Sequence, residues 1–319
     1  MNRRSFLVKS SVAVSAGLLS RSLLRAQTPP AAPAGGPPAP APYQTTFTPL
    51  RRNVGLFTGR GGTIGWLANS TALAAVDTQF PDAAQRFLDE FPNRGGRQFD
   101  LLINSHHHGD HVGGNPVFRP VTKSIVAHAN VPDLMKAAGA RANPPQTNFV
   151  LPDATFTDTW RKELGDEIVS AKYYGAAHTK GDIVVTFERA NVVHMGDLMF
   201  NRVYPVMDRP GGASTKGWIS VMEKAVADHD ADTIYIAGHS AANNPQFTVK
   251  CTRADLLVFR DYLAAMLAHV EKEIKAGKTK EEIVVLQNLP GFTDFHVERG
   301  SRLPGNLGAT YDELTTPSA

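Results

Sequence analysis

Residues 101–111, Leu-Leu-Ile-Asn-Ser-His-His-His-Gly-Asp-His, concentrate the side chains best suited to bind metal ions. The apolar start predicts a buried strand, and four imidazoles and one carboxylate follow it. Because side chains alternate along an extended backbone, His106 and His108 point the same way and can share one metal ion. Asp110 and His111 follow a glycine and can turn toward a second ion. The segment therefore predicts parts of two neighbouring metal sites.

Three later segments each present one more ligand at the end of an expected strand. His178 follows Gly-Ala-Ala, Asp197 follows Gly196, and His239 follows Gly238, so the backbone can approach closely at each position. The predicted metal ligands are His106, His108, Asp110, His111, His178, Asp197 and His239. The chain has one cysteine, so the ligands must be nitrogen and oxygen. This donor set favours two Zn²⁺ ions, with iron or manganese as alternatives.

The His-x-His-x-Asp-His run at 106–111, followed in order by AHTKGD, GDLMF and GHS, resembles the metallo-β-lactamase superfamily from about Phe47 to Lys250. The resemblance implies an α/β fold, an αββα sandwich of two mixed β-sheets flanked by helices, with the metals at one edge between the sheets. It assigns His106, His108 and His178 to the first metal, Asp110, His111 and His239 to the second, and Asp197 to a bridge between them.

The residue at position 197 indicates the branch of the superfamily. True β-lactamases carry cysteine or serine there, whereas thioesterases, lactonases and related hydrolases carry the bridging aspartate. The resemblance thus implies a binuclear hydrolase in which a metal-bridging hydroxide attacks the carbonyl of an ester, lactone, thioester or amide. Asp110 is the catalytic candidate that orients the hydroxide and passes its proton to the leaving group. Tyr204 is a candidate donor to the oxyanion.

Two alternatives stay open at this point. One is a genuine β-lactamase. The other, from a different class, is a di-iron redox protein or a metal-binding accessory protein that uses the same cage of ligands.

The elements that must position these residues alternate along the chain, which indicates an α/β sandwich. Periodicity predicts strands at 62–69, 72–77, 100–104, 124–128, 167–174, 182–188, 191–195 and 233–237. It predicts helices at 82–91, 134–140, 217–228 and 253–275, the last with an apolar stripe that we expect to pack on the sandwich.

Other residues near the predicted ligands have expected roles of their own. His107 alternates to the opposite face of the extended segment, and His194 is expected to pack within a strand. Asp77 and Asp182 can each accept a hydrogen bond from a ligand imidazole or serve a turn. Residues 205–214, with two prolines and two glycines, are expected to form an active-site loop.

The amino terminus predicts an export signal. Residues 2–9, Asn-Arg-Arg-Ser-Phe-Leu-Val-Lys, resemble the start of a bacterial twin-arginine signal peptide, which implies the twin-arginine export machinery as a partner and a periplasmic or secreted location. The expected organisation is a signal peptide at 1–26, a Pro/Ala-rich linker at 27–46, a hydrolase domain at 47–250 and a C-terminal helical extension at 251–319.

Charge limits the kind of partner. The first 26 residues hold five of the 33 basic side chains and none of the 30 acidic ones, so the remaining chain has a net charge of −2. This balance argues against a nucleic-acid surface, and we expect a small-molecule substrate and no membrane contact once the signal is removed. Composition gives no oligomeric state.

Overall fold

The computed structural model describes residues 43–319 except 93, 148, 242–245, 296–301 and 317–319. The expected signal peptide, 1–26, and residues 27–42 of the expected linker lie outside the described residues. In the part of the chain that is described, no helix is long and apolar enough to cross a membrane.

A seven-stranded sheet is built in chain order, antiparallel from its first to its fourth strand and parallel from the fourth to the seventh. Its strands are β1 (Thr46–Arg51), β2 (Val54–Thr58), β3 (Ile64–Ala68), β4 (Leu73–Val76), β5 (Leu101–Asn104), β6 (Ile125–His128) and β7 (Ala154–Phe156).

A six-stranded sheet has the order β13-β12-β11-β10-β9-β8, with one parallel pair, β11 and β12, and antiparallel pairs elsewhere. Its strands are β8 (Thr159–Leu164), β9 (Glu167–Lys172), β10 (Val184–Phe187), β11 (Val192–Asn201), β12 (Ile234–Ser240) and β13 (Lys250–Cys251). Both sheets are therefore mixed, as predicted.

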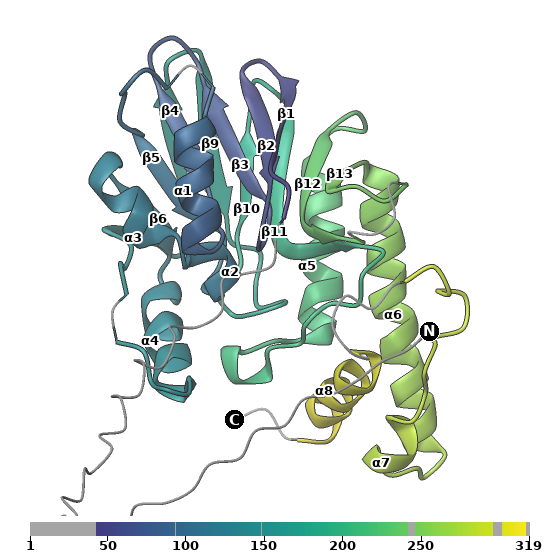
Figure 1. Ribbon diagram of the computed structural model, residues 1–319. Coiled ribbons are helices and arrows are strands. Elements are labelled where there is room, and N and C mark those ends of the chain that lie inside the picture. The colour runs from purple at the N-terminus through teal and green to yellow at the C-terminus, as the bar shows by residue number, and fades with distance from the viewer. Residues whose placement is uncertain (1–42, 93, 148, 242–245, 296–301, 317–319) are drawn as a thin grey trace, which may run out of the picture. The chain divides into compact units, whose positions relative to one another are not determined.

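Helices cover the outer faces of both sheets (Figure 1). The helical segments are α1 (Pro81–Glu90), α2 (Gly109–Val112), α3 (Asn115–Phe118), α4 (Val131–Arg141), α5 (Thr215–Asp228), α6 (Arg253–Lys275), α7 (Lys280–Ile283) and α8 (Leu303–Thr315), with 3₁₀ turns at Arg119–Val121 and Arg209–Gly211. Apolar side chains of both sheets, such as Ile103 and Val185, meet in one inner core. The neighbouring Leu102 joins the core beneath α1, because strand side chains alternate between faces.

On the other outer face, α5 and α6 pack on the six-stranded sheet. α6 begins with a capping box, in which Thr252 and Asp255 satisfy each other's backbone N–H groups. Its apolar stripe, including Phe259, Leu263 and Met266, is buried in a core that it shares with α5 and β11. The layer order is thus helix, sheet, sheet, helix, which confirms the predicted αββα sandwich.

Some elements differ from the sequence-based expectations. No strand was expected at β1, β2, β7 or β8, and β11 runs on to Asn201 instead of ending at residue 195. α8 lies within the helical extension expected at 251–319, but no separate helix was expected there. β8 was missed because its side chains are mostly polar and exposed, so no apolar alternation marks it.

Phe259 provides a test of the α6 packing. Its ring lies 5.6 Å from the Trp218 ring and is fully buried, so Phe259→Ala leaves a cavity and should lower the free energy of unfolding by about 3–5 kcal/mol. Denaturant unfolding measures the loss. Lys272→Ala, on the exposed side of the same helix, should change it by less than about 0.5 kcal/mol. Equal effects of the two substitutions would show that α6 does not form this core.

Candidate metal centre

The seven predicted ligands come from separate segments and lie together at one edge of the sandwich. His106 and His108 follow β5, while Asp110 and His111 lie in the short helix α2. His178 comes from the loop between β9 and β10, Asp197 from β11 and His239 from β12. Their donor atoms form two groups, His106, His108, His178 and Asp197 in one and Asp110, His111 and His239 in the other.

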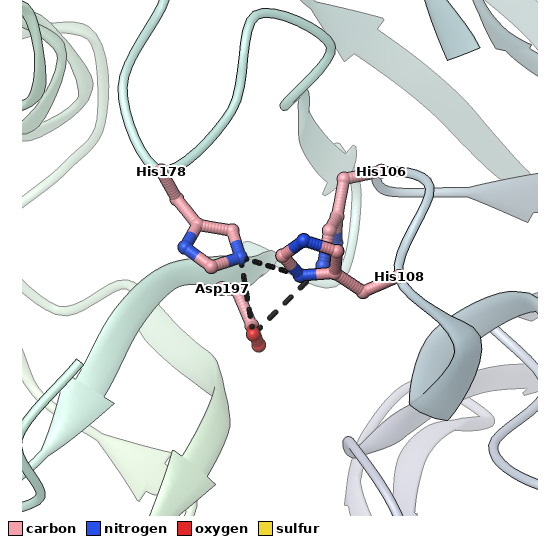
Figure 2. Close-up of side chains that lie close together, drawn as sticks. All are labelled: His106, His108, His178 and Asp197. Atoms are coloured by element: carbon pink, nitrogen blue, oxygen red, sulfur yellow. Dashed lines mark hydrogen bonds and ion pairs between the residues drawn. The ribbon is translucent and has the colours of Figure 1, made fainter. Parts of the chain in front are cut away.

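In the first group, three imidazoles and a carboxylate face a common point (Figure 2). His178 Nε2 lies 2.9 Å from His108 Nδ1 and 3.5 Å from Asp197 Oδ2. His106 Nε2 lies 3.8 Å from the same carboxylate oxygen.

The second group has a similar spacing. His239 Nε2 lies 3.4 Å from His111 Nε2 and 3.2 Å from Asp110 Oδ2. The other carboxylate oxygen of Asp197, Oδ1, is 3.0 Å from His111 Nε2 and 3.4 Å from His239 Nε2. Asp197 therefore presents one oxygen to each group, the arrangement expected of a bridging ligand.

Two observations show that the donors fit a metal ion. His106 Nε2 is buried and has no hydrogen-bond partner, although buried polar atoms are normally paired. Two ligands at about 2.0–2.1 Å from a tetrahedral ion are roughly 3.4 Å apart, close to the spacings within each group. Imidazole and carboxylate donors suit Zn²⁺, and they also suit iron.

Glycines let the segments approach one another. A Cβ atom on Gly238 would collide with Asp197 Oδ1, and one on Gly62 would collide with the His111 ring. Gly62 N also donates to the Asp110 carbonyl at 3.0 Å. The β2–β3 turn and the end of β12 thus close on the second group from both sides.

Asp197 does not end its strand, contrary to the expectation. β11 continues beyond it, and the pairing with β12 shifts register on both sides of Gly196, which has a φ of 50°. Such an irregularity re-aims a side chain within a continuing strand, so the carboxylate turns toward the imidazoles.

Asp77 orients a ring of the second group. Asp77 Oδ2 lies 2.8 Å from His111 Nδ1 and also accepts a hydrogen bond from Ser105 Oγ at 2.7 Å. Of the two roles left open for this residue, the structure supports the contact with a ligand imidazole. Asp182 has the other role, because its carboxylate accepts from Thr179 N and Thr179 Oγ1 within a turn.

Two contacts to the first group were not anticipated. Asp208 Oδ2 lies 3.0 Å from His108 Nε2, and the Val206 carbonyl accepts from His178 Nδ1 at 2.8 Å. These contacts use Nε2 of His108 and Nδ1 of His178. The other nitrogen of each ring faces the remaining donors of the first group. Asp208 lies in the loop at 205–214 that the sequence places at the active site, but no local pattern singles out its carboxylate, because His108 is 100 residues away.

The remaining candidates take the following positions. His107 is outside both groups, with Nε2 3.4 Å from Asp208 Oδ2. His194 is a buried strand residue, as predicted, and its Nε2 lies 3.0 Å from the Thr63 carbonyl. The Tyr204 ring packs against Tyr262, and its hydroxyl has no hydrogen-bond partner in the described part of the chain. Its role as an oxyanion donor stays a prediction.

The two groups differ in electrostatics. Burial, together with the nearby His108, lowers the pKa of His178 to about 3, so this ring is neutral at pH 7. Burial also disfavours charge on His239, but Asp197 and Asp110 outweigh it and raise the pKa of His239 to about 9. The carboxylates around the second group thus stabilise a positive charge there. Either a proton on the ring or a bound metal cation can provide that charge.

A cavity of about 660 Å³ lies beside His239. It is lined by the β2–β3 turn, including Gly61 and Thr63, and by the segment from Phe247 to Lys250. No aspartate or glutamate is among the described residues that line it.

The four-layer sandwich and the histidine-aspartate groups at its edge define a class of α/β proteins with a candidate binuclear metal site. The family model of the metallo-beta-lactamase superfamily matches residues 58–239, more than half of the chain. The chain belongs to this superfamily.

Two curated proteins are similar in sequence. The chain is 33% identical over 132 residues to a hydroxyacylglutathione hydrolase of Methylococcus capsulatus, covering 41% of this chain and 44% of that enzyme. It is 22% identical over 175 residues to a type 2 metallo-beta-lactamase of Elizabethkingia meningoseptica, covering 54% of this chain and 67% of that enzyme. The match therefore spans less than half the length of the first relative.

Solved structures share the fold at low identity. The sec-alkylsulfatase Pisa1 of Pseudomonas sp. has a TM-score of 0.62 at 16% identity, covering 82% of this chain and 49% of that chain. A metallo-beta-lactamase of Pontibacter korlensis has a TM-score of 0.54 at 15% identity, covering 69% and 99%. The chain spans about half the length of the sulfatase, so these likenesses show the fold alone.

Gly238 tests whether close packing against Asp197 matters for the site. Gly238→Ala should push the carboxylate aside and lower the affinity for zinc by about 10-fold or more. Equilibrium dialysis with elemental analysis of zinc per chain measures this. Gly305→Ala is the control, because a Cβ there meets no atom within 4 Å. Unchanged zinc affinity in both variants would contradict the role given to Gly238.

Proposed function

We propose that this protein is a metal-dependent hydrolase of the bridging-aspartate branch that cleaves an ester-like carbonyl bond, with thioesters and lactones as the preferred class. One observation carries the proposal, namely that the two oxygens of Asp197 face the two groups of imidazoles. His106, His108 and His178 would hold one ion, Asp110, His111 and His239 the other, and Asp197 would contact both.

Two divalent ions bound there would polarise the substrate carbonyl and activate water as a nucleophile near neutral pH. The residues of the chain would position the two ions and transfer a proton during the reaction. Asp197 is 4% exposed, whereas the Asp110 side chain is 28% exposed. Asp110 is therefore the carboxylate that solvent and substrate can reach, which supports its proposed role in passing a proton to the leaving group.

The cavity beside His239 would hold the part of the substrate that does not react. Its lining combines hydroxyl groups and apolar side chains with one lysine, Lys250, and without a carboxylate among the described residues. We therefore infer a neutral or anionic substrate, because a cationic one would find no countercharge there.

A β-lactamase is the second candidate, favoured by the similarity to the enzyme of Elizabethkingia meningoseptica. Asp197 argues against a β-lactamase, because true β-lactamases of the superfamily carry cysteine or serine at this position. A sulfate ester is a further outcome to include, because the sandwich also resembles that of the sec-alkylsulfatase.

Hydrolysis by the zinc-loaded protein tests the proposal directly. A thioester, a lactone, a β-lactam and a secondary alkyl sulfate should be compared by kcat/KM, and we expect the thioester or the lactone to be the best substrate. His108→Ala should reduce turnover to the background rate, because it removes a donor of the first group.

His269→Ala is the matched histidine control. His269 is a partly exposed residue of α6 outside both groups, so this variant should retain turnover. Preference for the β-lactam would show that Asp197 does not exclude antibiotic hydrolysis. No hydrolysis with two metals bound would overturn the proposal, and oxygen consumption by an iron-loaded protein would favour the redox alternative.

We also propose that the chain is exported by the twin-arginine machinery to the periplasm, on the basis of the Arg3-Arg4 pair before Phe6-Leu7. Replacing both arginines by lysine should keep the protein in the cytoplasm, because the receptor reads the arginine pair and not its charge. Cell fractionation measures the distribution, with Lys9→Arg as control. Equal periplasmic amounts of the double variant and the control would contradict export by this route.

A further inference from the structure

The loop between β11 and α5, residues 202–214, contacts two imidazoles of the first group. The Val206 carbonyl accepts from His178 Nδ1, and Asp208 Oδ2 lies 3.0 Å from His108 Nε2. Both contacts fix the ring nitrogen that faces away from the group. This one loop therefore sets the rotation of two of the three rings, and it determines which nitrogen of each is free to bind a metal.

Asp208 is itself held in place. Its Oδ1 accepts the N–H of Gly211 at 2.9 Å, and a side chain at Gly211 would collide with this carboxylate. The Gly211 carbonyl accepts from Lys180 N, and the Ala177 carbonyl accepts from Ser214 N, both at 2.9 Å. The loop is thereby joined to the segment that carries His178.

Both ends of the loop are bonded to the C-terminal helix α8. Near its start, the Pro205 carbonyl accepts from Asn306 Nδ2 at 3.0 Å. At its end, the Glu313 carboxylate accepts from Ser214 Oγ at 2.7 Å and from Thr215 N at 2.6 Å. Charged acceptors make the stronger hydrogen bonds, so Glu313 is a firm anchor.

α8 is a fixed element. Leu303 and Leu307 are fully buried in the core that also contains α6, and Asn306 is 3% exposed. Bonds from a packed helix to both ends of a loop restrict the conformations available to the residues between them.

We propose that α8 and the 202–214 loop form a dedicated support for the first metal site, in which Asp208 is the positioning residue of His108. The proposal rests on the metal-binding role proposed above. The second group is supported from a different place, because Asp77 at the end of β4 orients His111. Asp77 also holds Ser105, whose Oγ lies 3.0 Å from Nδ1 of His106 in the first group. A change at Asp208 should therefore act on the first site, whereas a change at Asp77 should act on the second site and, through Ser105, on His106.

Zinc titration of the full chain distinguishes the two supports. Ring ¹⁵N resonances of the histidines, read during the titration, report binding at each site, and calorimetry gives the affinities. Asp208→Asn keeps the size of the side chain and removes its charge. It should weaken binding at His108 and His178 about 10- to 100-fold and leave binding at His111 and His239 unchanged. Asp77→Asn should weaken binding at His111 and His239 and should also perturb the His106 ring, which Asp77 reaches through Ser105.

The contribution of α8 is tested by two neighbouring carboxylates. Glu313→Gln removes the charged anchor of the loop and should weaken the first site selectively, by less than Asp208→Asn does. Asp312→Asn is the matched control, because the Asp312 carboxylate pairs with Lys280 at 2.6 Å and not with the loop. It should leave both sites unchanged.

The outcomes distinguish failure of the proposed function from failure of the proposed support. Failure of the unchanged protein to bind zinc would overturn the proposed function. Two bound zinc ions, with equal weakening of both sites or of neither in Asp208→Asn, would overturn the support proposal and leave the function standing. Identical behaviour of Glu313→Gln and Asp312→Asn would overturn the role of α8. If Asp208→Asn does not fold, Glu313→Gln decides between these outcomes.

Discussion

The structure is organised around a buried carboxylate, that of Asp197. Only 4% of this side chain is exposed, and an ionised carboxylate removed from water costs several kcal/mol unless opposite charge or hydrogen-bond donors surround it. The compensation comes from imidazoles on both sheets and from α2. They can reach the carboxylate only because β11 is irregular at Gly196 and because Gly238 has no side chain in the way. The Asp197 carboxylate therefore constrains how closely these segments approach one another at the site.

Much of the fold could be predicted from local patterns. Leu101–Asn104 is a short apolar run between polar residues, and it forms the buried strand β5 that the sequence predicts. Helix α6 spans the predicted residues 253–275, because its cap and its apolar stripe are both encoded locally. The seven candidate ligands, which the structure brings together, could be predicted for a different reason. Metal-binding side chains occur in short motifs beside small residues, so their types and spacing are visible without knowledge of the tertiary structure.

The residues that were missed depend on contacts distant in sequence. α8 contains a proline and two glycines, which weaken any helix prediction, and burial of Leu303 and Leu307 stabilises it instead. Asp208 lies in the expected active-site loop, but only the folded chain shows that its carboxylate is beside His108. Asp197 is expected at a strand end, whereas β11 continues past Gly196 and Asp197 with an irregular register.

The place of α8 in the chain has a consequence for biosynthesis. α8 follows every other described element, so it is the last of them to leave the ribosome. Before it docks, the Pro205 carbonyl and Ser214 lack the partners that fix the ends of their loop. The loop that contacts His108 and His178 is then without its two attachments to this helix. Full support of the first group therefore requires that Leu303–Thr315 has been translated and has docked.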